Sequence, residues 1–264
     1  MNLVSTALIL VLGALSQAHA GERHLILIGG GSRPKPALAR FVDLAGGPKA
    51  RILAITWAGE DPEDYFKAFA DDLALSTVTS VENSVSTAAM ASKKQDFMSQ
   101  LSSATGIFIC GGDQNRITAL FKEHPDLRDA LQAKYKAGAV FGGTSAGTAV
   151  ISEVMITGEG DFTVIDGAKV ETDRGLGLLK DVITDQHFIV RQRENRLFSL
   201  ILAHPDLLGV GVDERTALAV EDEKEAENLG EGQVVMVQAG PSERLILDLL
   251  KPGQRYDLKK KKRL

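Results

Sequence analysis

The sequence predicts an α/β fold with a mostly parallel central sheet flanked by helices and with antiparallel strands in its second half. In the first half, short apolar runs alternate with segments of helical character, which is typical of a parallel sheet wound with helices. In the second half, apolar runs follow one another across polar turns, which indicates antiparallel strands. The sequence has neither an internal repeat nor a Pro/Ser-rich linker, so we expect one domain.

The elements of the first half follow from these runs. Strands are expected at residues 24–28, 51–57, 76–82, 106–110 and 139–142. Helices are expected between them, at residues 35–45, 62–75, 87–101 and 125–135. Pro62 and Pro125 fit the first turns of their helices, where the missing N–H is not needed.

The second half contains one strongly helical segment, residues 193–203. The strands expected around it are residues 162–170, 178–184, 208–212, 216–220, 233–237 and 244–249. Together they predict a mixed sheet whose later strands are antiparallel.

The two ends of the chain differ from the rest. Residues 3–15 are apolar, and Ala18-His19-Ala20 matches the small-x-small cleavage pattern of a secretory signal. We therefore expect a signal peptide at 1–20, a single α/β domain at 21–258, and a secreted or periplasmic mature protein that does not contact the membrane. The alternative is a buried or membrane-anchoring N-terminal helix, although the apolar run is shorter than the roughly 20 residues of a membrane span. Residues 259–264 form a basic C-terminal tail, expected to be disordered and solvated.

Composition excludes several kinds of site. The net charge of −5 does not indicate nucleic-acid binding. The single cysteine, Cys110, ends an apolar run and is expected in the core. The scattered histidines predict no metal site, and Gly29-Gly30-Gly31-Ser32 lacks the third glycine and the ribose acid of a dinucleotide loop. We expect no cofactor, and we interpret the glycine run as a tight turn near the rim of the site.

A nucleophile is predicted at Ser145. The segment Gly143-Thr144-Ser145-Ala146-Gly147 follows an apolar run and has the Gly-x-Ser-x-Gly spacing of a nucleophile elbow. Glycines two positions before and after the serine leave room for a sharp turn from strand to helix. The alternative is an ordinary glycine-rich turn. Ser145 would stand at the carboxyl end of a strand, where open α/β sheets place their sites.

A serine nucleophile needs a base and a group that orients the base. His187 follows the apolar run 178–184 amid polar residues and is the strongest candidate for the base. Among several acids, Glu214 stands out beside Asp213 at the end of an apolar run, although a solvated turn explains either acid equally well. The order serine, histidine, acid differs from the α/β-hydrolase order. The other histidines of the mature chain have less suitable surroundings: His24, His124 and His204.

The chain resembles the cyanophycinases, serine peptidases related to aspartyl dipeptidases and, more distantly, to class I glutamine amidotransferases, whose fold it would share. The resemblance covers most of the mature chain. It rests on four blocks in the family's order: Gly111-Gly112-Asp113-Gln114, Gly142-Gly143-Thr144-Ser145-Ala146-Gly147, Asp185-Gln186-His187-Phe188 with Arg191, Arg193 and Arg196, and Gly211-Val212-Asp213-Glu214-Arg215-Thr216.

The resemblance implies a role for each matching residue. Ser145 would be the nucleophile, His187 the general base and then acid, and Glu214 the carboxylate that orients His187. The oxyanion hole would use backbone N–H groups of Gly112, Asp113 and Ala146. The residues implied in binding substrate are Gln114, Asp185, Gln186, Arg191, Arg193 and Arg196. Thr148 departs from the family's smaller residue and would trim the pocket.

The implied function is an exported serine exopeptidase that hydrolyses cyanophycin, a poly-aspartate carrying arginine on each β-carboxyl, to β-Asp-Arg dipeptides. The three arginines could hold substrate carboxylates through paired hydrogen bonds. The alternative is that they form a charged, solvated helix face, which would have the same sequence pattern. Two alternatives stay open: a dipeptidase acting on α-linked aspartyl peptides, and a non-catalytic exported binding protein on the same scaffold. The resemblance also suggests a homodimer.

Overall fold

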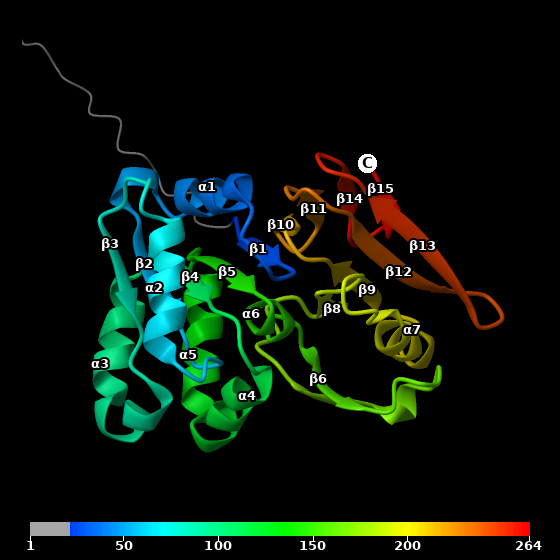
Figure 1. Cartoon of the computed structure of the whole chain (residues 1–264), viewed down its shortest axis with the longest axis horizontal. Helices are drawn as coiled ribbons and strands as arrows, with labels where there is room; N and C mark the ends of the chain where they lie inside the picture. Colours follow the sequence, from blue (N-terminus) through cyan, green and yellow to red (C-terminus); the bar gives the residue numbers. More distant parts are fainter. Residues whose placement is uncertain (1–21) are drawn as a thin grey trace, which may run out of the picture.

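In residues 22–264, which the computed structural model describes, nine strands form the main sheet in the order β15-β14-β11-β10-β1-β5-β4-β2-β3 (Figure 1). Five neighbouring strands are parallel: β1 (His24–Ile28), β5 (Val140–Thr144), β4 (Gly106–Ile109), β2 (Arg51–Ile55) and β3 (Ser80–Asn83). Four antiparallel strands extend the sheet beyond β1: β10 (Ala217–Glu221), β11 (Glu225–Asn228), β14 (Arg255–Asp257) and β15 (Lys262–Arg263).

Helices cover both faces of the parallel strands (Figure 1). One face is covered by α1 (Lys35–Leu44) and α2 (Pro62–Asp72). The other is covered by α3 (Met90–Ser103), α4 (Gln114–Glu123) and α5 (Pro125–Lys136). Because both faces are covered, strands such as β1 are apolar at consecutive positions rather than at alternate ones.

A second sheet of four strands, in the order β13-β12-β9-β8, packs against α7 (Glu194–Ala203). Its strands are β8 (Val182–Gln186), β9 (Leu208–Val212), β12 (Val234–Gly240) and β13 (Arg244–Leu250). A separate two-stranded ribbon precedes it, formed by β6 (Val154–Gly160) and β7 (Val170–Arg174). The short helices are α6 (Ala146–Ala149), η1 (Gly47–Lys49), η2 (Thr87–Ala89) and η3 (Gly167–Lys169).

The predicted fold class is confirmed, and several details differ, among them the strands β6, β11 and β14, which were not predicted. The antiparallel strands divide between two sheets and a ribbon instead of joining one mixed sheet. The strand predicted at 162–170 is a loop and the helix η3, because the carboxylates of Asp161 and Asp166 accept hydrogen bonds from backbone N–H groups two residues ahead. Helix α4 was not predicted at all.

The basic C-terminus is ordered, so the expectation of a disordered tail was wrong. The carboxylate of Asp257 accepts hydrogen bonds from the N–H groups of Lys259 (3.0 Å) and Lys260 (2.8 Å). The carbonyl of Lys261 accepts one from Gln238 (2.8 Å), and β15 then pairs with β14. Hydrogen bonds to Asp257 and Gln238 thus order a segment whose basic composition alone suggests disorder.

The predicted signal peptide, 1–20, lies outside the described residues. No helix within residues 22–264 combines the length and apolar character that a membrane crossing requires. That the chain forms one domain stays a prediction.

Candidate active site

Ser145 occupies a sharp turn between β5 and α6, with φ 53° and ψ −115°. Its N–H donates to the carbonyl of Ile28 (3.0 Å). A Cβ on Gly143 would lie 2.5 Å from backbone atoms of Gly147, and a Cβ on Gly147 would collide with the carbonyl oxygen of Ile109. Both glycines are therefore required by close backbone packing, as the elbow pattern predicts.

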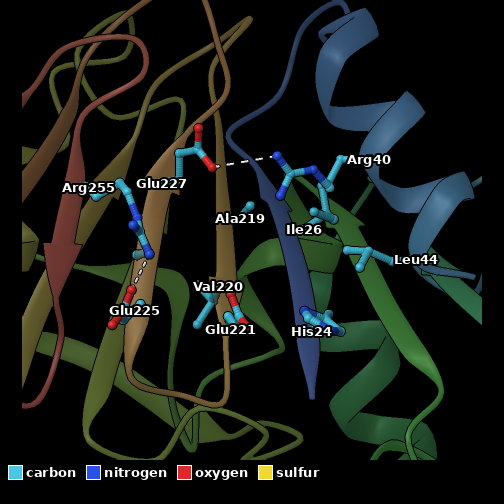
Figure 2. A pocket seen from close by; sticks show the side chains of 11 residues that line it. His24, Ile26, Arg40, Leu44, Ala219, Val220, Glu221, Glu225, Glu227 and Arg255 are labelled. Atoms are coloured by element: carbon cyan, nitrogen blue, oxygen red, sulfur yellow. Dashed lines mark hydrogen bonds and ion pairs between the residues drawn. The ribbon is translucent and has the colours of Figure 1, made fainter. Parts of the chain in front are cut away.

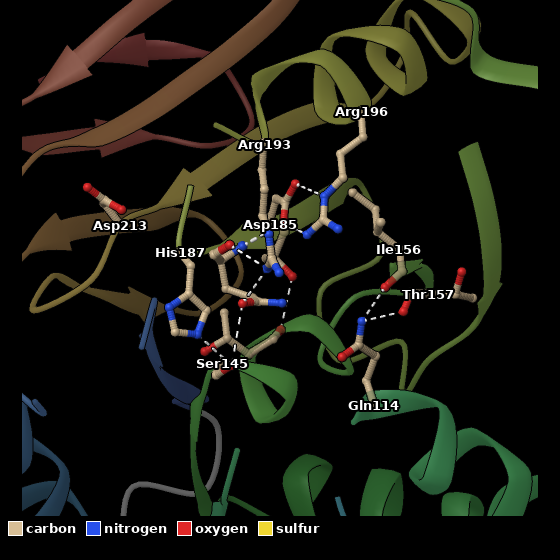
Figure 3. Close-up of polar contacts among 12 residues, drawn as sticks. Gln114, Ser145, Ile156, Thr157, Asp185, His187, Arg193, Arg196 and Asp213 are labelled. Atoms are coloured by element: carbon tan, nitrogen blue, oxygen red, sulfur yellow. Dashed lines mark hydrogen bonds and ion pairs between the residues drawn. The ribbon is translucent and has the colours of Figure 1, made fainter. Parts of the chain in front are cut away.

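Three side chains from separate strand ends form a continuous chain of hydrogen bonds (Figure 3 shows Ser145 and His187). Ser145 Oγ lies 2.8 Å from Nε2 of His187, which follows β8. Nδ1 of the same ring lies 2.5 Å from Oε1 of Glu214, which follows β9. A carboxylate only accepts, so the proton on the ring sits at Nδ1 and leaves Nε2 free to accept from Ser145. This is the geometry of a serine, its base and the orienter of that base.

The surroundings of His187 keep its imidazole neutral. Burial lowers the pKa of His187, and the positive charges of Arg191 and Arg193 lower this pKa further. The hydrogen bond and charge of Glu214 oppose these effects without outweighing them. Nε2 is thus unprotonated at neutral pH, as a general base must be.

Two backbone N–H groups beside Ser145 are free to stabilise an oxyanion. A Cβ on Gly111 would lie 3.4 Å from that of Ser145, which places the turn 111–113 next to the nucleophile. Within the described part of the chain, the N–H groups of Gly112 and Ala146 donate no hydrogen bond.

Asp113, predicted as a third oxyanion donor, does not fit. Its N–H donates to the carbonyl of Ala58 (2.9 Å), and its carboxylate caps α4 by accepting from the N–H of Asn115 (2.9 Å). Gly112 and Ala146 therefore remain as the candidate oxyanion donors, because the N–H of Asp113 is used within the turn.

Gln114 is buried and holds the ribbon β6–β7 in place (Figure 3). Its amide nitrogen donates to the carbonyls of Ile156 (2.9 Å) and Thr157 (2.7 Å). Both N–H bonds of the amide are used in this way. The amide nitrogen of Gln114 therefore anchors β6 and is not available to a substrate.

Asp185 and Arg196, both predicted to bind substrate, bind each other instead (Figure 3). Nε of Arg196 donates to Oδ2 of Asp185 at 2.7 Å, and a second bond joins Nη2 to Oδ1. Their side chains are only 1% and 4% exposed. The prediction that Arg196 holds a substrate carboxylate was wrong, because a buried guanidinium needs this carboxylate as its counter-charge.

Arg193 connects to Ser145 through Gln186. Its Nη1 donates to the main-chain carbonyl (2.9 Å) and to Oε1 (2.8 Å) of Gln186, and the same Oε1 lies 3.4 Å from Ser145 Oγ. Burial, followed by repulsion from Arg196, lowers the pKa of Arg193 to about 10, so it stays charged at neutral pH. Because arginine only donates, this contact fixes which end of the Gln186 amide faces it.

Arg191 is the most exposed of the three predicted arginines, at 52%, and its Nε lies 3.9 Å from Oε1 of Glu214. It borders a hollow of about 220 Å³ with a positively charged wall. The lining residues of this hollow are Gly158, Phe162, Arg191, Gln192, Arg193 and Arg196. This hollow, beside the residues that contact Ser145, is suited to a negatively charged group.

A second hollow of about 220 Å³ lies over β1, β10 and β11, beside α1 (Figure 2). Ion pairs cross it between Arg40 and Glu227 (3.7 Å) and between Arg255 and Glu225. It reaches His24 at the amino end of β1, whereas Ser145 follows the carboxyl end of β5, a parallel neighbour. This hollow is therefore separate from the site around Ser145.

Sequence reasoning misplaced Thr148 and missed Asp213. Thr148 is fully buried and donates to the carbonyls of Ile28 (2.7 Å) and Gly143 (2.9 Å), so it supports the elbow and does not trim the pocket. Asp213 accepts hydrogen bonds from the N–H groups of Ile189 and Val190, each at 3.1 Å, and so holds the turn that follows His187. Its position beside Glu214 was the available signal.

Cys110 lies in the core, as predicted, with no exposed surface. Burial raises the pKa of its thiol to about 12, so the thiol stays protonated. Among the described residues, no group of three or more His, Cys, Asp or Glu side chains is arranged to hold a metal ion.

Comparisons with known proteins identify similar chains. The model of peptidase family S51 matches residues 25–227. A cyanophycinase of Synechococcus elongatus is 36% identical over 223 residues, which cover 83% of this chain and 69% of that protein. A cyanophycinase of Geminocystis herdmanii is 34% identical over 225 residues, covering 81% and 80%. The crystal structure of a peptidase from an acI-B1 actinobacterium shares the fold, with a TM-score of 0.64, 19% identity, and coverage of 89% of this chain and 96% of that one.

Proposed function

Because this chain belongs to peptidase family S51, we propose that it is a serine peptidase that hydrolyses cyanophycin. The observation that carries the mechanism is the hydrogen-bonded array of Ser145, His187 and Glu214. The observation that favours the substrate is similarity to proteins named cyanophycinase over more than four fifths of the chain.

In the proposed reaction, Ser145 Oγ forms a bond to the scissile carbonyl carbon while Nε2 of His187 takes the hydroxyl proton. Glu214 stabilises the resulting imidazolium, and the N–H groups of Gly112 and Ala146 receive the oxyanion. As the C–N bond breaks, His187 gives its proton to the leaving amine. A water molecule, deprotonated by the same Nε2, then hydrolyses the acyl ester and frees Ser145.

The charge around the site supports a substrate rich in carboxylates. Arg191 is half exposed beside Glu214, and Arg193 stays charged behind it. The positively charged hollow that they border suits the free carboxylates of cyanophycin, which belong to the arginines attached to its aspartate backbone. We infer exopeptidase cleavage to β-Asp-Arg dipeptides as the finer form of this activity.

The test compares three substrates: purified cyanophycin, α-linked Asp-X dipeptides and a denatured general protein, with mass spectrometry of the products. We expect β-Asp-Arg from the polymer and little product from the other two. Faster hydrolysis of α-Asp-X dipeptides would make the protein an aspartyl dipeptidase. No hydrolysis of any substrate, with no labelling of Ser145 by a serine-directed phosphonate, would make it a binding protein.

We also propose that the protein is exported, on the apolar run and the Ala18-His19-Ala20 pattern of its first twenty residues. The test is fractionation of the producing cells with N-terminal sequencing of the active protein. Activity in the periplasm or medium, on a chain that begins at Gly21, is the expected result. An active cytoplasmic chain that begins at Met1 would contradict it.

A homodimer is proposed through the outer edge of β13. Among the described residues, β13 pairs with β12 alone, so its other edge presents unpaired backbone groups at the right of Figure 1. Ile246, Leu247 and Leu249 are 44–50% exposed on this strand. A long, apolar, uncovered edge favours pairing with another strand.

The sequence of β13 fits a second copy of itself. Antiparallel pairing centred on Ile246 would place Arg244 opposite Asp248 of the second copy, and Leu245 opposite Leu247. The contact is small, so we expect a dimer that dissociates on dilution. Light scattering across concentrations tests this: Ile246→Lys should give a monomer, and Leu75→Glu, at a 95% exposed apolar control position, should not. A wild-type monomer at every concentration would refute the dimer.

A further inference from the structure

The glycine turn that follows β1 lies between the segments that carry the base and its orienter. The carbonyl of Gly29 accepts from the N–H of His187 (2.8 Å), and the carbonyl of Gly30 accepts from the N–H of Arg215 (2.9 Å). The N–H of Gly29 donates to the carbonyl of Thr216 (3.0 Å). Backbone hydrogen bonds thus connect this turn to His187 on one side and to the neighbours of Glu214 on the other.

The turn also contacts the two side chains directly. A Cβ on Gly30 would lie within 2.7 Å of three imidazole atoms of His187, including both nitrogens. A Cβ on Gly31 would lie 3.2 Å from Oε2 of Glu214. The Cα of Gly30 therefore packs against the imidazole ring of His187. Any other residue at this position would place its Cβ where the ring lies and would displace the ring.

We propose that the turn Gly29–Gly31 is the positioning element of the catalytic base: its backbone holds the imidazole of His187 where both nitrogens are bonded at once. The two bonds, to Ser145 Oγ and to Glu214 Oε1, need one ring orientation. Gly30 restricts rotation of the imidazole ring on one side. The carbonyl of Gly29 holds the backbone of His187, from which the ring projects, through a hydrogen bond. The proposal rests on the proposed serine mechanism and gives this turn a role in positioning His187.

Gly30→Ala tests the proposal, and Gly138→Ala is its matched control. Both glycines have positive φ, +125° for Gly30 and +94° for Gly138, so alanine brings backbone strain at each. A Cβ on Gly138 meets nothing within 4 Å, whereas one on Gly30 meets the ring of His187. The comparison therefore separates displacement of the ring from the strain of the backbone.

For Gly30→Ala we expect kcat on cyanophycin to fall about 100-fold or more, the loss typical of a group displaced by about 1 Å, with KM little changed. Gly138→Ala should keep the wild-type kcat. If Gly30→Ala does not fold, Gly31→Ala, whose Cβ would have atoms of Glu214 as its nearest neighbours, should also lower kcat, by a smaller factor. A wild-type kcat in folded Gly30→Ala, or in Gly31→Ala where that variant replaces it, would overturn the proposal.

A spectroscopic readout separates this proposal from the proposed function. In proton NMR, the proton between Nδ1 of His187 and Oε1 of Glu214 should give a far-downfield resonance in the wild type and in Gly138→Ala. The resonance should move or vanish in Gly30→Ala, or in Gly31→Ala if that variant replaces it. An unchanged resonance would refute the positioning role even if the wild type failed to cleave cyanophycin, and a lost one would support it regardless of substrate.

Discussion

Asp185→Ala should destabilise the protein strongly, because it leaves the guanidinium of Arg196 buried without a counter-charge. The two side chains are 1% and 4% exposed and share two hydrogen bonds. Breaking a buried ion pair by removing one partner costs about 3–5 kcal/mol. In a protein of this size, each kcal/mol lowers Tm by about 2–4 °C, so we expect a fall of roughly 6–20 °C.

Scanning calorimetry of purified variants measures this effect, and two further variants control it. The double variant Asp185→Ala with Arg196→Met removes both charges and should recover most of the lost Tm, because an apolar pair can replace a buried ion pair. Arg191→Ala, at a half-exposed side chain, should leave Tm almost unchanged. An unchanged Tm and a raised KM in Asp185→Ala would contradict a structural role for the ion pair and would indicate that Arg196 holds substrate.

Three further predictions concern the reaction. His187→Ala should lower kcat by roughly 10⁶, as loss of the base does in serine peptidases, while Glu214→Gln should cost less; equal losses would contradict the assigned roles. Burial lowers the pKa of His187, so the midpoint of the acidic fall in kcat/KM should lie below about 6.5, the ordinary pKa of histidine. A midpoint of this fall above that value would contradict the assignment of His187 as a buried base. Arg191→Ala should raise KM for cyanophycin, and Arg191→Lys should restore it poorly because lysine lacks the guanidinium fork; wild-type KM in both would exclude contact with substrate.

The inner strands of the parallel sheet were predictable because both of their faces are buried, whereas the edge strand β3, which is only half-buried, was predicted with shifted bounds. Continuous apolar runs such as those of β1 and β4 are fully covered by helices, so they stand out from the polar sequence around them. Helix α4 was missed because Gly111–Gln114 drew attention as a motif, although Ile117, Leu120 and Phe121 beyond it have helical spacing.

Ser145, His187 and Glu214 were predictable as candidates because each residue follows an apolar run, just beyond the carboxyl end of a strand. The ion pair between Asp185 and Arg196 was not predictable from the sequence. The sequence shows two charged residues eleven positions apart, but only packing between β8 and α7 decides that they meet in the interior. Asp113 failed for a similar reason, since its N–H partner, Ala58, comes from a distant turn.

The most direct test of the central claim is the turnover of cyanophycin by purified Ser145→Ala beside the wild type. We expect a loss of roughly 10⁶ in kcat with the fold intact, because one hydroxyl on a turn contributes little to packing. Near-normal turnover by the folded variant would contradict the assignment of Ser145 as the nucleophile and, with it, the serine mechanism.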